Sequence, residues 1–297
     1  MGGMSSRLTR LLPLVALALL PVLTGCDSPS APIPPDDTVD PIDTEAAWSP
    51  DGNSILYTHA VDHIWRLNLT SGARESLTTG RSPAWSPDGR SIALIDGYRL
   101  YVMDLATGTK QVIGPNAPSF QPAWSPDGRR IAYGTNYGDL DGSNAIALIH
   151  PDGSEFDDIT QHGTGEWNQP RWSPDGAWLV HRRYVNGFAE LFVMDTTGAQ
   201  PRRLTNDEAN DEDPAWSPDG QWIAWSWYAP DQTQSGLWLM RSDGANRRLV
   251  IAGGFDPSWA PDGNRIVFSY WASRDTGATI WTIHPDGSNL TRLIPSY

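Results

Sequence analysis

The residues of this chain best suited to binding chemistry are acidic. Residues 206–213 read Asn-Asp-Glu-Ala-Asn-Asp-Glu-Asp, and further acids stand at Glu45 and Asp256. Glu45, Asp213 and Asp256 share one property: each stands three residues before a tryptophan of a recurring motif. Equivalent positions in a repeat occupy equivalent places in the fold, so these three acids should ring one mouth of a central channel. Such a mouth would suit a basic protein segment or a cation.

Aromatic residues fall in the connections next to these acids. Exposed rings beside carboxylates would suit a basic segment, a cation, or a sugar stacked on a ring. The alternative for any charge run is a solvated loop, and the sequence leaves both interpretations open. The candidate binding face therefore comprises Glu45, Trp167, Asp207, Glu208, Asp211, Glu212, Asp213, Trp227, Tyr228, Asp256 and Trp271.

Patterns for catalysis or metal binding are weak elsewhere. The chain has no Gly-x-Ser-x-Gly elbow, no Walker-type loop and no dinucleotide fingerprint, so we assign no catalytic residue. The six histidines show no metal-ligand spacing, and His181 replaces an apolar residue of an expected strand, which favours a structural role. Residues 139–144 alternate oxygen ligands around Gly142 but lack the distal glutamate of a Ca²⁺ loop, so a polar loop is favoured. We expect no cofactor, with a divalent cation as the alternative.

One short motif must position these residues. Trp-Ser-Pro-Asp-Gly occurs five times, a sixth copy has Ala260 in place of serine, and successive tryptophans are 37 to 48 residues apart. Proline presets φ for a type I turn and glycine accepts the left-handed conformation, so each copy predicts a tight hairpin. The structural turn residues are Trp48, Asp51, Gly52, Trp85, Asp88, Gly89, Trp124, Asp127, Gly128, Trp172, Asp175, Gly176, Trp216, Asp219, Gly220, Trp259, Asp262 and Gly263.

Each repeat contains four short strand signals, which in the second repeat lie near 82–86, 91–95, 100–104 and 109–113. Repeats of this length and content predict an all-β, six-bladed β-propeller with four antiparallel strands per blade. The short turns should share one face and the long connections the other, where recognition usually lies. These long connections are expected at 134–145, 161–169, 184–190, 206–213, 226–236 and 269–279.

The chain divides into three expected parts: a signal peptide at 1–25, a Pro- and Asp-rich tether at 26–43, and the propeller at 44–297. The repeat is complete at both ends, with no strand left over. We therefore expect blades 6 and 1 to close the ring by side-chain packing. A fifth strand from residues 38–43 is the alternative.

The N-terminal segment predicts export. The apolar run of residues 11–23 is too short to span a bilayer and fits a signal-peptide core. It ends in Leu-Thr-Gly-Cys26, which resembles the lipobox of bacterial lipoproteins and implies acylation of Cys26; the alternative is ordinary cleavage beside a stray cysteine. Cys26 is the only cysteine, so no internal disulfide can form. We expect an exported lipoprotein, membrane-anchored in the cell envelope and facing the periplasm in a Gram-negative cell.

Net charge excludes one class of partner. The formal charge is −14, and it becomes −16 when residues 1–25 and their two arginines are removed. A surface this acidic repels phosphate backbones, so nucleic acid is a poor partner.

The motif followed by an apolar strand and Leu-Thr resembles the TolB-type propeller repeat across residues 44–297, and no copy has the Trp-Asp ending of WD40 blades. The repeat is also similar to propellers that precede the catalytic domain of dipeptidyl-peptidase-IV-type enzymes. The resemblance implies a monomeric six-bladed propeller that acts as a non-enzymatic platform for another envelope protein or peptide. Lyases built on this repeat place several histidines around a channel metal. The alternative function is therefore a carbohydrate-active propeller, either a glycan binder or an oligosaccharide lyase, with its site in the channel.

Overall fold

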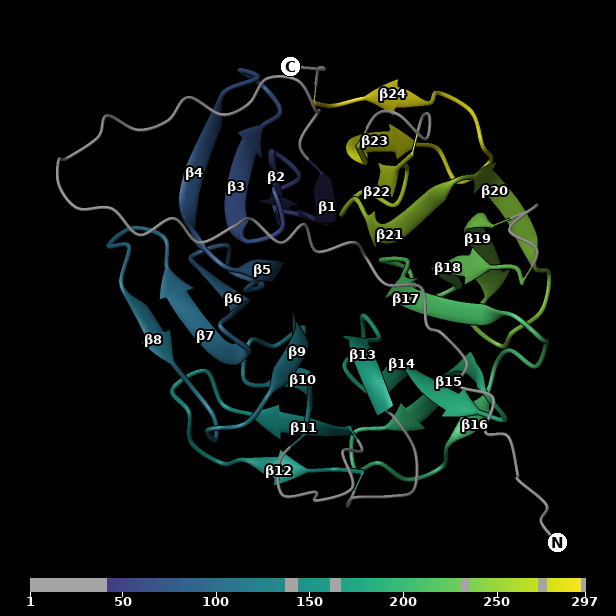
Figure 1. The fold of residues 1–297 in the computed structure, drawn as a ribbon, viewed down its shortest axis with the longest axis horizontal. Helices are drawn as coiled ribbons and strands as arrows, with labels where there is room; N and C mark the ends of the chain where they lie inside the picture. The colour runs from purple at the N-terminus through teal and green to yellow at the C-terminus, as the bar shows by residue number, and fades with distance from the viewer. Residues whose placement is uncertain (1–41, 137–143, 161–166, 231–234, 272–276, 295–297) are drawn as a thin grey trace, which may run out of the picture. The chain divides into compact units, whose positions relative to one another are not determined.

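The described part of the chain consists of strands and turns. The computed structural model describes residues 42–136, 144–160, 167–230, 235–271 and 277–294. In these residues, 24 strands form six antiparallel sheets of four strands each, arranged radially around a central channel (Figure 1). The expected six-bladed propeller is confirmed. None of the described residues forms a helix of sufficient length and apolar character to cross a membrane.

Strand bounds follow the repeat closely in the first three blades. Blade 1 contains β1 (Asp43–Trp48), β2 (Ser54–His59), β3 (His63–Asn68) and β4 (Arg74–Thr79). Blade 2 contains β5 (Arg81–Trp85), β6 (Ser91–Asp96), β7 (Arg99–Asp104) and β8 (Lys110–Val112). Blade 3 contains β9 (Ser119–Trp124), β10 (Ile131–Thr135), β11 (Ala145–Ile149) and β12 (Asp157–Asp158).

The last three blades include the longest strands. Blade 4 contains β13 (Trp167–Trp172), β14 (Trp178–Val185), β15 (Phe188–Asp195) and β16 (Arg202–Arg203). Blade 5 contains β17 (Asn210–Trp216), β18 (Trp222–Tyr228), β19 (Gly236–Arg241) and β20 (Arg248–Ala252). Blade 6 contains β21 (Gly254–Trp259), β22 (Ile266–Tyr270), β23 (Thr279–Ile283) and β24 (Thr291–Arg292). In every blade the first strand is innermost (Figure 1).

The hydrophobic core lies between the blades. Six buried apolar clusters occur among the described residues, and each joins two neighbouring blades. The second strand of blade 1 packs against both neighbouring blades. Ile55 and Tyr57 pack toward blade 6, whereas Leu56 between them packs toward blade 2. Side chains alternate between the faces of a strand, so a strand that is apolar at consecutive positions can cover two neighbours.

The six motif turns also contact one another around the ring. All six motif glycines have φ near +70°, as expected. A Cβ placed on Gly128 would lie 3.8 Å from Cδ of Pro87 in the preceding blade, and Gly52 faces Pro261 in the same way across the closure. Within each turn the aspartate accepts a backbone N–H two residues ahead, as Asp51 does from Asn53 at 3.0 Å.

Packing between blades 6 and 1 closes the ring in the described residues. The amide of Asp43 donates to the carbonyl of Ala278 at 2.8 Å, and Trp48 and Ile280 belong to one buried cluster. Asp43, which we placed in the tether, is the first residue of β1. The described sheet of blade 6 holds β21 to β24 alone. Residues 38–41 of the alternative closing strand lie outside the described residues.

Two of the long connections expected from the sequence are shorter than expected. In place of a loop at 184–190, β14 and β15 continue to a two-residue turn at Asn186 and Gly187, both with positive φ. Asn-Gly is a preferred sequence for such a hairpin, so the prediction of a loop was wrong. The acidic run is also partly strand, because β17 begins at Asn210. The connections at 134–145, 161–169, 226–236 and 269–279 each fall partly outside the described residues.

The motif glycine provides a direct test of the hairpin geometry. Gly128→Val should lower the free energy of unfolding by about 1–2 kcal/mol, because a β-branched residue resists positive φ. A Cβ at position 128 would make only ordinary van der Waals contacts, so backbone strain is the main source of the loss. Gly128→Asn is the control and should cost less, since asparagine tolerates this conformation. Equal melting temperatures for Gly128→Val and the parent protein would contradict the prediction.

Candidate binding site in the central channel

Six residues, one from the innermost strand of each blade, surround the channel. Each stands three positions before a motif tryptophan, and all six have φ between 44° and 56°. The pairing register of every innermost strand shifts at this point, so each residue lies in a β-bulge. A bulge bends its strand and redirects a side chain. We call these residues the channel ring: Glu45, Ser82, Gln121, Gln169, Asp213 and Asp256.

Positive φ is unfavourable at these positions. The left-handed conformation costs a residue with a side chain roughly 1–2 kcal/mol, and here it recurs in every blade. Strained backbone persists where surrounding structure enforces it, and it clusters at functional sites. In five blades the next residue is a proline, which has no N–H to donate and is therefore accepted at a bulge. These prolines are Pro83, Pro122, Pro170, Pro214 and Pro257.

The channel contains a cavity of about 340 Å³ with two chemically different ends. Five residues of the channel ring line it, namely Glu45, Ser82, Gln121, Asp213 and Asp256, and so do all six motif tryptophans. Each innermost strand runs from its ring residue to its tryptophan. The polar end therefore faces the long connections and the aromatic end faces the motif turns.

Asp213 and Asp256 form a carboxyl pair in the ring. Their side chains hydrogen-bond to each other, and burial together with the neighbouring charge of Asp213 raises the pKa of Asp256 well above its usual range. Burial also raises the pKa of Asp213. Gln169 Nε2 donates to Asp213 Oδ1 at 2.6 Å, and the Ser226 hydroxyl donates to Oδ2 at 3.2 Å. The pair therefore holds a proton more tightly than separate carboxylates would.

Glu45 is fixed by donors from two blades. Ser82 donates to it from its backbone N–H at 2.7 Å and from its hydroxyl at 2.6 Å. The Thr58 hydroxyl donates at 2.8 Å. These bonds connect blades 1 and 2 and hold the carboxylate of Glu45 at the channel wall.

Arg171 places a positive charge among these acids. Its Nη1 donates to the carbonyl of Pro170 at 2.9 Å, and the side chain lines the cavity. Burial lowers the pKa of Arg171, while the carboxylates of Asp213, Glu45 and Asp256 act in the opposite direction. In the other blades the equivalent residue is alanine or serine. The channel thus has three acidic groups and one half-buried guanidinium.

Aromatic residues lie near the polar end. Trp271 is 45% exposed and stacks on Phe255 at a centroid distance of 6.0 Å. Tyr228 is 36% exposed, and burial of its phenol near Asp213 and Asp256 raises its pKa. Exposed rings and carboxylates therefore occur together near the polar end of the channel.

Other residues of the predicted binding face are placed differently. Trp167 is only 7% exposed, because it is the first residue of β13 and packs in the core between blades 3 and 4 under the guanidinium of Arg183. Asp211 is fully buried and accepts a hydrogen bond from Trp225 at 2.5 Å. Including Trp167 and Asp211 in an exposed face was therefore wrong.

The rest of the acidic run is mixed. Glu208 is exposed, Asp207 is half-buried, and Glu212 forms an ion pair of 3.1 Å with Arg182. Trp227 is half-buried against Trp238. The run is thus neither a solvated loop nor one continuous acidic patch.

Histidine does not contribute to the described cavity wall. His181 is fully buried between Trp167 and Phe192, and burial lowers its pKa to about 3. The described residues that line the cavity include one arginine and no histidine. His162 and residues 139–143 of the weak Ca²⁺ motif lie outside the described residues. The donors present in the described channel therefore do not fit the histidine-based metal set that the resemblance implied.

Sequence reasoning missed half of the channel ring. Ser82, Gln121 and Gln169 occupy the same position before the motif tryptophan as the three acids, so the signal was available in the repeat. Arg171 interrupts a column that is otherwise alanine or serine, which was also visible. An alignment of all positions of the six repeats, and not of the acidic positions alone, would have revealed the three polar ring residues and Arg171.

Comparisons with known proteins agree with the fold. A family model for PD40, the TolB beta propeller domain, matches residues 96–290, well over half of the chain. No curated protein sequence matches the chain significantly.

Several solved structures are similar to this chain. A protein assigned as TolB from Agrobacterium tumefaciens has 24% identity and a TM-score of 0.69, with 79% of this chain and 88% of that one covered. TolB from Acinetobacter baumannii has 20% identity and a TM-score of 0.64, with 85% of this chain but only 63% of that one covered. An oligogalacturonate lyase in complex with manganese has 18% identity and a TM-score of 0.59, with 84% and 76% covered. At these identities the likeness shows the fold alone.

Burial of His181 predicts a specific pH dependence. Its folded pKa of about 3 lies below the value of 6.5 expected on unfolding, so acid protonates the unfolded chain first. The stability that depends on neutral His181 is complete above pH 6.5 and is lost progressively as the pH falls toward 3. Because His181→Phe cannot take up that proton, its stability relative to the parent should improve by about 2 kcal/mol from pH 7 to pH 5 in urea titrations. Parallel pH profiles would show that His181 is not buried in its neutral form.

Proposed function

The chain belongs to the TolB β-propeller family, and we propose that it is a non-enzymatic platform that binds a basic protein or peptide segment in the cell envelope. The binding site is the polar end of the channel. One observation carries this proposal: Glu45, Asp213 and Asp256 line one cavity whose described wall contains a single arginine. A ligand cation would offset the excess negative charge.

Charge and shape favour a side chain of lysine or arginine. With one proton shared by Asp213 and Asp256, the channel still has two negative charges against that of Arg171. Interactions between charges strengthen where water is excluded, so a cation entering this cavity gains more than one on the surface. The exposed rings of Tyr228 and Trp271 add faces on which a cationic side chain could lie.

The acidic surface would also assist encounter with such a partner. The formal charge of −14 attracts a basic segment over distances of about a Debye length, which increases the association rate. Binding should therefore weaken as ionic strength rises. Specificity would come from the connections around the mouth, since loops on a rigid scaffold vary most readily.

A carbohydrate-active role is the second candidate. The stacked pair Phe255 and Trp271 favours it, because an exposed ring can pack against a sugar face. The acidic channel does not suit a polyuronate of the kind named for the manganese-bound lyase, since like charges repel. A glycan bound here would be neutral or cationic.

The N-terminal sequence supports a location in the cell envelope. We propose that residues 1–25 are removed and that Cys26 becomes acylated, so that residues 26–41 connect the propeller to a membrane. This would place the channel mouth close to other envelope proteins. It also makes a membrane-held partner accessible without requiring high affinity, because anchoring raises the effective concentration.

Removing channel charge should weaken the binding of a basic ligand. We expect Glu45→Gln combined with Asp256→Asn to weaken a fluorescent Lys- and Arg-rich peptide at least about tenfold in anisotropy titrations, because charge pairs of low solvent exposure contribute strongly. Because Asp213 and Asp256 share one proton, the channel variant removes one net negative charge. Asp88→Asn removes one negative charge in a motif turn on the opposite face and serves as the control. A peptide with glutamine in place of its basic residues should not bind.

The same variants distinguish the competing functions in cells. A photo-crosslinker at Tyr228 should capture one envelope protein with the parent chain and lose it with the channel double variant. Equal capture by both chains would contradict the proposed site. Saturable binding of a neutral oligosaccharide that is lost in Trp271→Ala would favour the glycan alternative instead.

Lipid anchoring is tested through the single cysteine. Cys26→Ala should abolish incorporation of a labelled fatty acid and move the protein from the washed membrane fraction to the soluble fraction. The physical reason is that two or more acyl chains are needed for stable membrane attachment. Unchanged membrane association of the variant would refute acylation as the anchor.

A further inference from the structure

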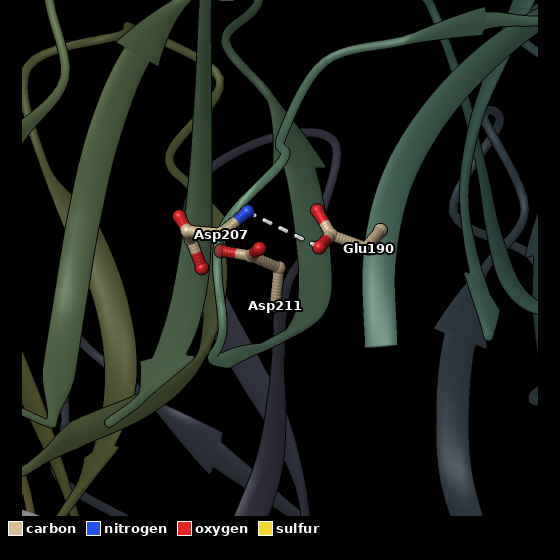
Figure 2. A group of neighbouring side chains, drawn as sticks. All are labelled: Glu190, Asp207 and Asp211. Atoms are coloured by element: carbon tan, nitrogen blue, oxygen red, sulfur yellow. Dashed lines mark hydrogen bonds between the residues drawn. The ribbon is translucent and has the colours of Figure 1, made fainter. Parts of the chain in front are cut away.

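A second group of carboxylates lies where blade 4 meets blade 5. Glu190 comes from β15, Asp207 from the connection after β16, and Asp211 from β17. One oxygen of each can be chosen so that all three lie within 4.8 Å of one another. Figure 2 shows the carboxyl group of Asp211 between those of Asp207 and Glu190 in this view, and the backbone N–H of Asp207 donates to Glu190 Oε1 at 3.2 Å. Among the described residues this is the only such group of acidic, histidine or cysteine side chains.

Asp211 contributes an oxygen that has no partner. The residue is fully buried, and its Oδ1 accepts the indole N–H of Trp225 at 2.5 Å, but Oδ2 is buried without a hydrogen bond. The Thr205 hydroxyl, which also lies beside Asp211, has one proton and donates it to Glu190 Oε2 at 2.7 Å. A buried acceptor without a donor is unfavourable unless something else occupies the site.

The cations already present do not balance the three acids. Arg203 pairs with Glu190 at 2.8 Å and Arg247 pairs with Asp207 at 3.2 Å. Both arginines are about one-third exposed and could turn toward solvent. When all three acids are ionised, Asp211 is the one left without a counter-charge.

An equivalent aspartate in blade 1 shows what is special about blade 5. Asp43 and Asp211 occupy the same position, two residues before the ring residue, and both are fully buried. Asp43 faces His59 at 2.7 Å and has arginines nearby. Asp211 faces Asp207 and Glu190 instead. The acidic surroundings therefore belong to blade 5 and are not a general feature of the repeat.

We propose that Glu190, Asp207 and Asp211 bind a hard divalent cation of the Ca²⁺ class. Three oxygens that were all 4.8 Å apart would each lie about 2.8 Å from a central ion, so a small side-chain adjustment brings them to the usual Ca²⁺–oxygen distance of about 2.3–2.6 Å. Carboxylate oxygens are the ligands such ions prefer, and water would complete the coordination shell. Arg247, held to Asp207 by a half-exposed ion pair, is the group that the ion would displace.

The bound ion would connect two blades. It would join a strand of blade 4 to the connection and first strand of blade 5, directly before Glu212 and Asp213. Its predicted effect is to stabilise the acidic run next to the channel. The ion site and the channel remain separate, since their carboxylates are different residues.

Terbium luminescence tests the proposal, because Tb³⁺ substitutes for Ca²⁺ and is excited by a nearby indole. Trp225 contacts Asp211 directly and would act as the donor. The purified full chain should give saturable Tb³⁺ emission that Ca²⁺ reverses. Asp211→Asn should weaken binding at least about tenfold by removing the unpartnered oxygen's charge. Arg247→Gln should bind more tightly than the parent, because it removes the competing cation.

Three control variants locate the ion. Glu208→Gln removes an exposed charge in the same connection, Asp43→Asn removes the equivalent aspartate of blade 1, and Glu45→Gln alters the channel. All three should bind Tb³⁺ as the parent does. If Asp211→Asn does not fold, as judged by near-ultraviolet circular dichroism, Asp207→Asn replaces it and should show the same loss. Absence of saturable emission in the parent, parental affinity in Asp211→Asn, or loss of binding in Glu45→Gln would each overturn the assignment.

Discussion

Every feature of this molecule depends on one constraint: a four-stranded blade has two apolar faces and cannot cover either by itself. The six buried clusters of the described residues lie between blades rather than within them, including the cluster between blades 6 and 1. A row of such sheets would leave an apolar face at each end, so closing the ring removes the exposed ends. Closure fixes the channel, and with it the distances between residues that are far apart in sequence.

The channel site is a by-product of this geometry. Six bulges occur at equivalent positions, and the residues at five of them line one cavity. The β-bulge is therefore the same in every blade, and the chemistry of the channel depends on which residue occupies each bulge. Here three acids, two amides and one serine occupy the bulges, and Arg171 is added from a single blade. A propeller of this kind can change its ligand by substitution in the ring without altering its fold.

The sequence predicted the repeat almost completely and the site only partly, for physical reasons that differ by residue. The turn glycines were predictable because positive φ is a local requirement. The placement of Glu45, Asp213 and Asp256 around one cavity followed from pseudo-symmetry. The burial of Trp167 and Asp211 could not be predicted from the repeat, because it depends on how β13 and β17 pack against neighbouring blades. The hairpin at Asn186 and Gly187 was predictable from these two residues alone, but we expected a long connection there instead.

The channel site and the site between blades 4 and 5 both have fewer cationic side chains than carboxylates. In each, buried or half-buried arginines neutralise some of the carboxylates and leave one or more without a counter-charge. Replacing a buried ionic group with apolar residues of similar volume is often neutral or stabilising, so packing does not require these charges. The repeat itself supplies an apolar alternative: the position of Asp211 is Trp167 in blade 4 and Gly254 in blade 6. Acids kept at such positions, with an incomplete set of counter-ions, are best explained by a cation that arrives from outside the chain. For the channel that cation would belong to a partner protein, and for the site between blades 4 and 5 it would be a metal ion.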